Sequence, residues 1–184
     1  IICGLIFSLL LASMLVVPWQ LKKQGSAWID SSPAVLSTTS RLMEHFASRG
    51  RPVILTYHCH AGNPGLFGSF YRSYISCGSF DAGLHEALPL HLAHSIITKQ
   101  TYDAFHECPL QNLLHSHDCS QVVVCGLLTH LCVESTARAA FSRGIVPFVP
   151  VTATCDRNEE LHLNSLISMS DACAIPITLS EVLI

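Results

Sequence analysis

The sequence predicts an α/β protein of the doubly wound, Rossmann-like type, in which a mostly parallel sheet of about six strands forms the middle of three layers. Short apolar runs rich in β-branched residues alternate with amphipathic helical patterns along the 184 residues. The runs are apolar at successive positions, as strands covered by helices on both faces are. Hydrophobic residues make up 49% of the chain and charged residues 12%, which excludes a disordered protein.

The N-terminal segment is apolar almost without interruption from Ile1 to Val17. We expect residues 1–12 to form an apolar extension and Ser13–Val17 to form the first buried strand of a single domain over residues 13–184. The alternative is a signal or anchor segment, because a membrane span needs about 17 residues or more. A signal peptide carries a basic residue ahead of its apolar run, whereas the first Lys here is Lys22. We therefore favour the strand and expect no membrane association.

The remaining elements follow in a regular order. Short runs rich in Val, Ile and Phe predict five further strands: Val53–Tyr57, Ser95–Thr98, Gln121–Cys125, Ile145–Val151 and Ala172–Ile177. Between them, helical periodicity predicts helices over Ala34–Ser48, Leu110–His115, His130–Ser142 and Asn158–Ser170. Residues 61–93 contain Gly, Pro and aromatic residues without a period. We expect them to form a long loop over the carboxyl ends of the strands, where open α/β sheets bind ligands.

The nine cysteines contain no Cys-x-x-Cys pair and no regular framework. Several stand within apolar runs, as Cys125 does, where a free thiol packs as a small hydrophobic group. We therefore expect reduced thiols and a cytoplasmic protein, since disulfide scaffolds belong to oxidising compartments. The net charge of −3, without a basic stripe, argues against a nucleic-acid partner.

The segment most informative about chemistry runs from the apolar strand through Gly126 to a predicted helix near Cys132. A thiol at a helix N-terminus faces backbone N–H groups and the positive end of the helix dipole, and both lower its pKa. The same N–H groups can receive an oxyanion. Cys132 is thus a candidate nucleophile, and the alternative is a buried structural thiol.

The run Gly126–Gly144 resembles the nucleophile motif of the isochorismatase-like cysteine hydrolases, a superfamily that includes nicotinamidases and N-carbamoylsarcosine amidohydrolase. Ile97–Phe105 resembles the lysine motif of these enzymes, and Thr154–His162 resembles the segment after their fifth strand. The resemblance implies a hydrolase that cleaves a C–N bond in a small amide or carbamoyl compound. We expect a small-molecule partner, no cofactor and a homo-oligomeric assembly.

Carried over to this sequence, the resemblance implies that Cys132 is the nucleophile and that Lys99 stabilises its thiolate. It further implies a cis peptide between Leu127 and Leu128 and an oxyanion hole made by the backbone N–H groups of Leu128 and Cys132. We expect the Cys132 sulfur and the Lys99 ammonium to lie within about 6 Å of each other. Members that cleave isochorismate lack this cysteine, so Cys132 favours the amide-hydrolysing branch.

The chain departs from the family pattern at Pro18, which stands where the family has a catalytic Asp at the end of the first strand. A positioned base contributes about 10²- to 10⁴-fold to a rate. The chain is therefore a weakened enzyme, a catalytically silent protein that retains the fold for binding or oligomer assembly, or a sequence altered at its N-terminus.

Two groups of side chains have the chemistry of metal ligands. Nicotinamidases hold a metal through an Asp-x-His motif, and the corresponding residues here are Thr56 and His58, followed by His60. Because this group lacks an acidic ligand, we expect no metal and interpret His58 and His60 as possible substrate contacts. The second group, His115–Cys119, lies between a predicted helix and strand, and we interpret it as a solvated loop.

Overall fold

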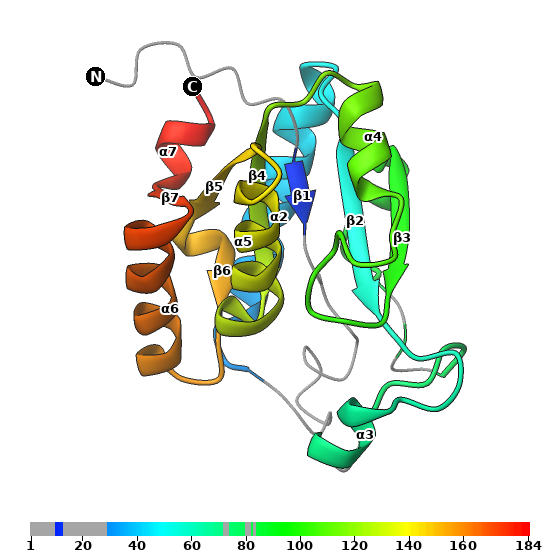
Figure 1. Ribbon diagram of the computed structural model, residues 1–184. Helices are drawn as coiled ribbons and strands as arrows, with labels where there is room; N and C mark the ends of the chain where they lie inside the picture. The colour runs from blue at the N-terminus through cyan, green and yellow to red at the C-terminus, as the bar shows by residue number, and fades with distance from the viewer. Residues whose placement is uncertain (1–9, 13–28, 72–73, 80–81, 83) are drawn as a thin grey trace.

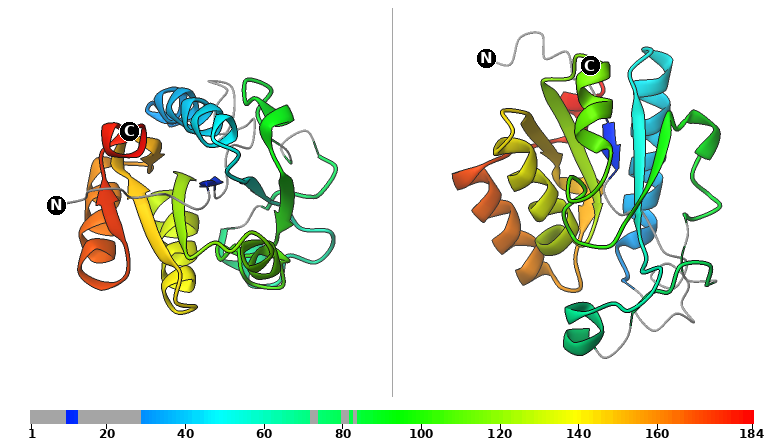
Figure 2. Two further views of the ribbon diagram at one scale, coloured as in Figure 1. Left: turned by 90° about the horizontal axis from the view of Figure 1, so that it is seen from above. Right: turned by 45° about the vertical axis from the view of Figure 1, so that its right-hand side comes forward.

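The computed structural model describes residues 10–12, 29–71, 74–79, 82 and 84–184. These residues form three layers, with a central sheet between helices on its two faces (Figures 1 and 2). Every pairing among the described strands is parallel. The doubly wound α/β fold that the sequence predicts is confirmed.

The sheet has the strand order β3-β2-β1-β4-β5-β7, and β6 pairs with the end of β4. The order reverses between β1 and β4, and in open α/β sheets this switch point is where ligands bind, at the carboxyl ends of the strands. The strand bounds are β1 (Leu10–Ala12), β2 (Val53–His58), β3 (Ser95–Lys99), β4 (Gln121–Leu127), β5 (Val146–Pro150), β6 (Thr154–Cys155) and β7 (Ile175–Ile177).

Helices cover both faces of the sheet. One layer is formed by α2 (Ser32–Ser48) and α7 (Leu179–Val182), and the other by α4 (Leu110–Ser116), α5 (Glu134–Phe141) and α6 (Glu159–Ala172). Shorter helical turns lie in the connections: α3 (Leu66–Tyr71), η1 (Leu90–Leu92), η2 (Thr129–Val133) and η3 (Val151–Ala153).

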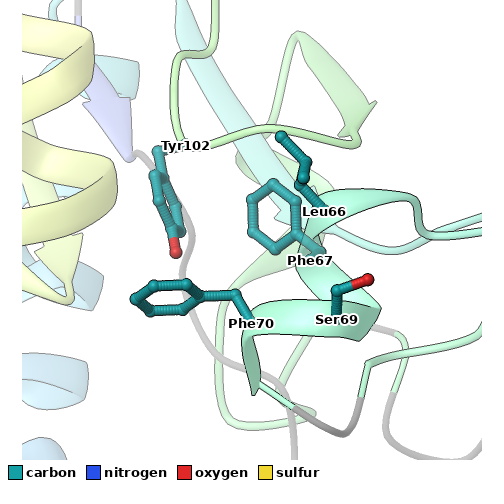
Figure 3. A pocket seen from close by; sticks show the side chains of 5 residues that line it. All are labelled: Leu66, Phe67, Ser69, Phe70 and Tyr102. Carbon is teal, nitrogen blue, oxygen red and sulfur yellow. The ribbon is translucent and has the colours of Figure 1, made fainter.

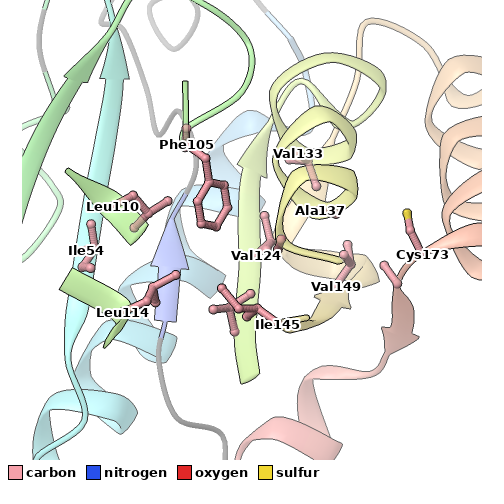
Figure 4. Close-up of a cluster of buried hydrophobic side chains, with 14 of the residues drawn as sticks. Ile54, Phe105, Leu110, Leu114, Val124, Val133, Ala137, Ile145, Val149 and Cys173 are labelled. Atoms are coloured by element: carbon pink, nitrogen blue, oxygen red, sulfur yellow. The ribbon is translucent and has the colours of Figure 1, made fainter. Parts of the chain in front are cut away.

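The central strands are buried on both faces, as their continuous apolar runs predict. Along β4, Val123 and Cys125 pack in the α2 layer, whereas Val122 and Val124 pack in the layer of α4, α5 and α6. Figure 4 shows part of this second cluster, in which Val124 lies among side chains from the helices. Because side chains alternate along a strand, one apolar run supplies both cores.

The strands predicted at the positions of β2, β3, β4 and β5 agree with the structure to within two residues at each end, and so do the helices predicted at α2, α4 and α6. The strand predicted over Ala172–Ile177 is wrong in its first half, because α6 continues to Ala172 and β7 begins at Ile175. The helix predicted from His130 begins instead as the π-helical turn η2, and α5 follows it from Glu134.

The first strand differs from the prediction. Leu10–Ala12, which the sequence analysis assigns to an apolar extension, forms β1 between β2 and β4 in the middle of the sheet. The predicted strand Ser13–Val17 and the candidate position Pro18 lie outside the described residues. A run that is apolar at nearly every position carries no periodic signal to fix where its strand begins, which explains the error. None of the helices in the described part of the chain has the length and apolar character needed to cross a bilayer.

The expectation of reduced thiols is wrong for Cys59 and Cys77, which form a disulfide across a sequence separation of 18 residues. Their spacing alone could not reveal it. Backbone hydrogen bonds return the chain to the end of β2: the His60 N–H donates to the Ile75 carbonyl, and the Cys77 N–H donates to the His60 carbonyl. The expectation of a cytoplasmic location rested in part on the absence of disulfides, and this part of the argument does not hold.

Breaking this disulfide is expected to lower the free energy of unfolding by about 3 kcal/mol, because the bond restricts a loop of this length in the unfolded chain. The measurement is urea denaturation of the wild type with and without a dithiol reductant. A Cys59→Ser, Cys77→Ser double variant serves as control. Its urea midpoint should equal that of the reduced wild type and should not change when the reductant is added. A wild-type midpoint that does not move on reduction would contradict the prediction.

Candidate active site

The carboxyl ends of β2, β3 and β4 bring the candidate residues to one edge of the sheet. His58 ends β2 and is paired in register with Lys99, the last residue of β3. The turn η2, which carries Cys132, begins two residues after the end of β4. Lys99 is 1% exposed and Cys132 is fully buried. The site therefore lies at the switch point and is shielded from water.

The Lys99 side chain is held by three acceptors. Its Nζ lies 2.9 Å from the carbonyl oxygen of Thr101, 2.8 Å from that of Tyr102 and 3.3 Å from the sulfur of Cys132. An ammonium has three N–H groups, so this arrangement satisfies all of them in a buried place. The predicted approach of Lys99 to Cys132 is confirmed, with the amine aimed at the sulfur by two backbone carbonyls.

The protonation of Cys132 differs from the expectation. Cys132 lies within the π-helical turn η2 rather than in the first turn of an α-helix. Burial raises the pKa of the Cys132 thiol, and the Lys99 ammonium lowers it without cancelling the rise. Complete burial deprives the thiolate of its hydration, and this loss outweighs the attraction of one neighbouring cation. Cys132 is thus a thiol in the resting protein at neutral pH, and its attack on a carbonyl needs a proton acceptor.

The peptide between Leu127 and Leu128 is cis, as the resemblance implies. Within the following turn, the N–H groups of Leu131 and Val133 both donate to the Leu128 carbonyl. This turn joins the end of β4 to the sulfur of Cys132, so the backbone of Leu128 and the nucleophile candidate belong to one local structure.

His58 and His60 form a buried pair beside Lys99. Their Nε2 atoms are 2.9 Å apart, so one ring donates a proton and the other accepts it. Phe67 of α3 covers both rings, with centroid distances of 4.9 and 5.1 Å, and also contacts Tyr102 at 4.9 Å. The described residues contain no group of three or more His, Cys, Asp or Glu side chains that could hold a metal ion.

Burial lowers the pKa of His58 to about 4, with smaller contributions from the Lys99 ammonium and from His60. In the unfolded chain His58 takes up a proton near its ordinary value of 6.5, whereas in the folded chain it does so only near pH 4. Stability is therefore highest above pH 6.5 and falls by about 3 kcal/mol from this group as the pH drops to 4. The pKa values of His60 and His162 are also lowered by burial and act in the same direction.

Urea denaturation between pH 7 and pH 4 tests this prediction. Replacing His58 by glutamine keeps a polar side chain but removes the ring that titrates, so the variant should lose less stability than the wild type over the same range. Equal pH dependence in the two proteins would show that other groups cause the loss.

An apolar hollow of about 470 Å³ has Phe67 in its lining (Figure 3), and the same ring contacts both histidines. Its lining combines the α3 side chains with the ring of Tyr102, whose carbonyl accepts a hydrogen bond from Lys99. The residues that line it are Leu66, Phe67, Ser69, Phe70 and Tyr102. The long connection over residues 61–93 thus supplies aromatic groups near the site, as expected, although no pattern in the sequence singled out Phe67.

Sequence reasoning also missed Asp156, whose buried carboxylate contacts the turn that carries Cys132. Its Oδ2 lies 2.8 Å from the backbone N and 2.6 Å from the Nδ1 of His130. The Thr129 hydroxyl similarly contacts Nδ1 of His162 in α6 at 2.8 Å. By contrast, His115–Cys119 comprises the last two residues of α4 and part of its connection to β4, away from the carboxyl ends of the strands. Its first four residues are exposed, in line with the solvated interpretation, although the group is a loop only from residue 117.

Solved structures share this fold across nearly the whole chain. A cysteine hydrolase from Pseudomonas syringae pv. phaseolicola 1448A has a TM-score of 0.89 at 19% identity and covers 96% of this chain and 91% of its own. N-carbamoylsarcosine amidase from Thermoplasma acidophilum has a TM-score of 0.77 at 18% identity, covering 93% and 95%. At such identities the likeness shows the fold alone.

Sequence relatives connect the chain to a family. It is 32% identical to nicotinamidase 3 of Arabidopsis thaliana over 124 residues, which are 65% of this chain and 63% of that protein. It is 28% identical to phenazine biosynthesis protein PhzD of Pseudomonas fluorescens over 153 residues, or 82% and 74% of the two chains. The model of the isochorismatase domain matches residues 23–181. The chain therefore belongs to the isochorismatase family of hydrolases.

Proposed function

We propose that this chain is a cysteine-dependent hydrolase that cleaves a C–N bond in a small amide or carbamoyl compound. The observation that supports it best is the buried contact of 3.3 Å between the Lys99 amine and the Cys132 sulfur. A buried cysteine that only fills space has no need of a buried ammonium beside it, since burying a charge is costly. The assignment of Cys132 and Lys99 as catalytic residues is part of this proposal.

In the proposed reaction, the Cys132 sulfur loses its proton and attacks the carbonyl carbon of the substrate. The electrons of the C=O bond move to oxygen, and the backbone N–H groups of Leu128 and Cys132 stabilise the oxyanion. The C–N bond then breaks, the nitrogen takes up a proton and leaves as an amine or ammonia, and a thioester remains on sulfur, or a thiocarbamate where the substrate is a carbamoyl compound. Water adds to the carbonyl carbon of this intermediate, releases the acid and restores the thiol.

Lys99 acts in this scheme as a fixed positive charge. Because its other two N–H groups are occupied by backbone carbonyls, the ammonium stays beside the sulfur while the thiolate forms. His58 and His60 lie at the same edge, where they provide a substrate contact. The family's proton acceptor is replaced by Pro18, so the thiol proton passes to water and the reaction is slow.

Release of ammonia from a panel of primary amides and N-carbamoyl compounds tests the proposal, with mass spectrometry of the intact protein to detect acylated Cys132. Because burial raises the pKa of Cys132 and no base is assigned, the rate should increase with pH through pH 9. A rate that is flat from pH 7 to pH 10 would contradict this route of proton transfer.

The second candidate is a catalytically silent member of the family, with the fold retained for binding or for assembly as a homo-oligomer. Pro18 and the raised pKa of the buried Cys132 favour it. Acylation of Cys132 by the substrate separates the two. A silent protein should form no thioester with any amide of the panel, whereas a hydrolase should show the acylated Cys132 in the mass of the intact protein.

A further inference from the structure

Asp156 stands at the start of the loop that follows β6, close to the turn that carries Cys132. The short strand β6 runs parallel to the end of β4, with Thr154 opposite Gly126 and Cys155 opposite Leu127. This register carries the chain to Asp156 beside the beginning of η2. The Asp156 side chain is fully buried. A carboxylate in such a place must be hydrogen-bonded, and its partners show what it holds.

Both oxygens of Asp156 accept hydrogen bonds. Oδ2 accepts from the backbone N–H of His130 at 2.8 Å and from the Nδ1 of its ring at 2.6 Å, and Oδ1 accepts from the backbone N–H of Arg157 at 2.8 Å. The Arg157 guanidinium lies 3.4 Å from Nε2 of the same ring. The Asp156 carboxylate and the Arg157 guanidinium thus contact the two ring nitrogens of His130 from opposite sides and fix the orientation of the ring.

His130 is the second residue of η2 and lies midway between Leu128 and Cys132. N–H groups in the first turn of a helical segment lack a carbonyl partner within that segment, so a carboxylate that accepts one of them fixes the turn in place. Asp156 does this from outside the turn and also holds the side chain of the same residue. The contact between Thr129 and His162 ties the turn to α6 at a neighbouring point.

We propose that Asp156 is a positioning residue that holds η2 so that the backbone N–H groups of Leu128 and Cys132 meet the carbonyl oxygen of a group bound to the Cys132 sulfur. The proposal rests on the proposed function, because it assigns Asp156 to the oxyanion hole of that reaction. A displacement of about 1 Å in such a site costs about 10²-fold in rate. Losing Asp156 should therefore reduce kcat much more than it changes KM.

The experiment compares wild type with Asp156→Asn in two assays. The first is amide hydrolysis, with kcat and KM measured separately. The second is addition of acetaldehyde labelled with carbon-13 at C1: the Cys132 sulfur bonds to the carbonyl carbon, and the thiol proton moves to the carbonyl oxygen. The resulting thiohemiacetal carbon has its own NMR signal and requires no turnover.

Asp156→Asn keeps the size of the side chain but places an amide NH₂ where one of the donors now points. It should lower kcat and the thiohemiacetal association constant by about 10- to 100-fold, with KM changed less than about twofold.

Two variants at His130 examine the same contact with Asp156 in place. His130→Asn retains a donor at the position of Nδ1, because both nitrogens are attached to Cγ, and should stay within about threefold of wild type; His130→Leu removes the donor and should lose more.

Asn158→Ala is the matched control in the same loop. Asn158 caps α6 by accepting from the Leu161 N–H, so this variant should lower the urea midpoint and leave both assays unchanged. Equal losses in Asn158→Ala and Asp156→Asn, or no loss in Asp156→Asn, would overturn the proposal.

The aldehyde assay also separates this proposal from the proposed function. If wild type hydrolyses no amide but forms the thiohemiacetal at Cys132, and Asp156→Asn weakens it, the hydrolase proposal fails while the positioning role stands. If wild type forms no thiohemiacetal at Cys132, the backbone of η2 does not stabilise the oxygen of a group bound to this sulfur, and the role assigned to Asp156 is wrong.

Discussion

Cys132→Ala is expected to abolish hydrolysis of every amide that the wild type cleaves, by about 10⁴-fold or more in kcat. Alanine has no nucleophile to form the thioester, and water cannot use the same approach to the carbonyl carbon. The variant should still fold, since the change leaves only a small void. It also removes one of the three acceptors of Lys99, so we expect a loss of about 1 to 3 kcal/mol in the free energy of unfolding.

The measurement is single-turnover release of ammonia together with the mass of the intact protein, which increases by the acyl group only if the thioester forms. Cys125→Ala is the matched control, because Cys125 is also fully buried but packs in the α2 layer, where Thr39 is its hydrogen-bond partner. This control should lose stability and keep its activity. Ammonia release that persists in Cys132→Ala would exclude Cys132 as the nucleophile.

The layers of the fold could be predicted because their signals are local. In β4, four successive apolar residues from Val122 to Cys125 supply both cores, and the helices before and after it have clear apolar faces. Such patterns indicate which segments are strands and helices, and the rules for parallel connections then restrict the possible topologies. The apolar run before residue 18 lacks a period, so the position of β1 could not be deduced.

The contact between Lys99 and Cys132 could be predicted because each residue lies in a recognisable motif next to the end of a strand. The raised pKa of Cys132 could not be predicted, because it depends on complete burial. The position of a thiol at the start of a helix says nothing about its burial. The role of Asp156 could not be predicted for a related reason. Its partner His130 is 26 residues away in sequence, and the register of β6 with β4 brings the two residues together.

The disulfide between Cys59 and Cys77 and the cover that Phe67 forms over the histidine pair share a cause. Both depend on how residues 61–71 and 74–77 lie against the end of β2, and the sequence of this connection has no hydrophobic period. Side-chain chemistry near a site is thus predictable where it lies on the sheet and unpredictable where it comes from a long connection.

Pro18→Asp is expected to raise the rate of amide hydrolysis by about 10²- to 10⁴-fold, or about 3 to 5 kcal/mol in the transition state. The reason is the protonation of Cys132: burial raises the pKa of this thiol, so attack at neutral pH needs a nearby base, and the resemblance implies a catalytic Asp at the position of Pro18. A carboxylate there would accept the thiol proton and later activate the water that cleaves the thioester.

Pro18→Asn is the control, because asparagine matches aspartate in size and relieves the constraint of proline but accepts no proton at neutral pH. Rates measured from pH 5 to pH 10 then distinguish a base from a change in backbone. The rate of Pro18→Asp should reach a plateau near pH 6, above the ordinary pKa of an Asp, whereas the rates of wild type and Pro18→Asn should both keep rising through pH 9.

If Pro18→Asn gains as much in rate as Pro18→Asp, the defect lies in the backbone conformation that proline imposes. If neither variant exceeds the wild type, another residue already accepts the proton from Cys132, and the buried ring of His58 beside Lys99 is the first to replace.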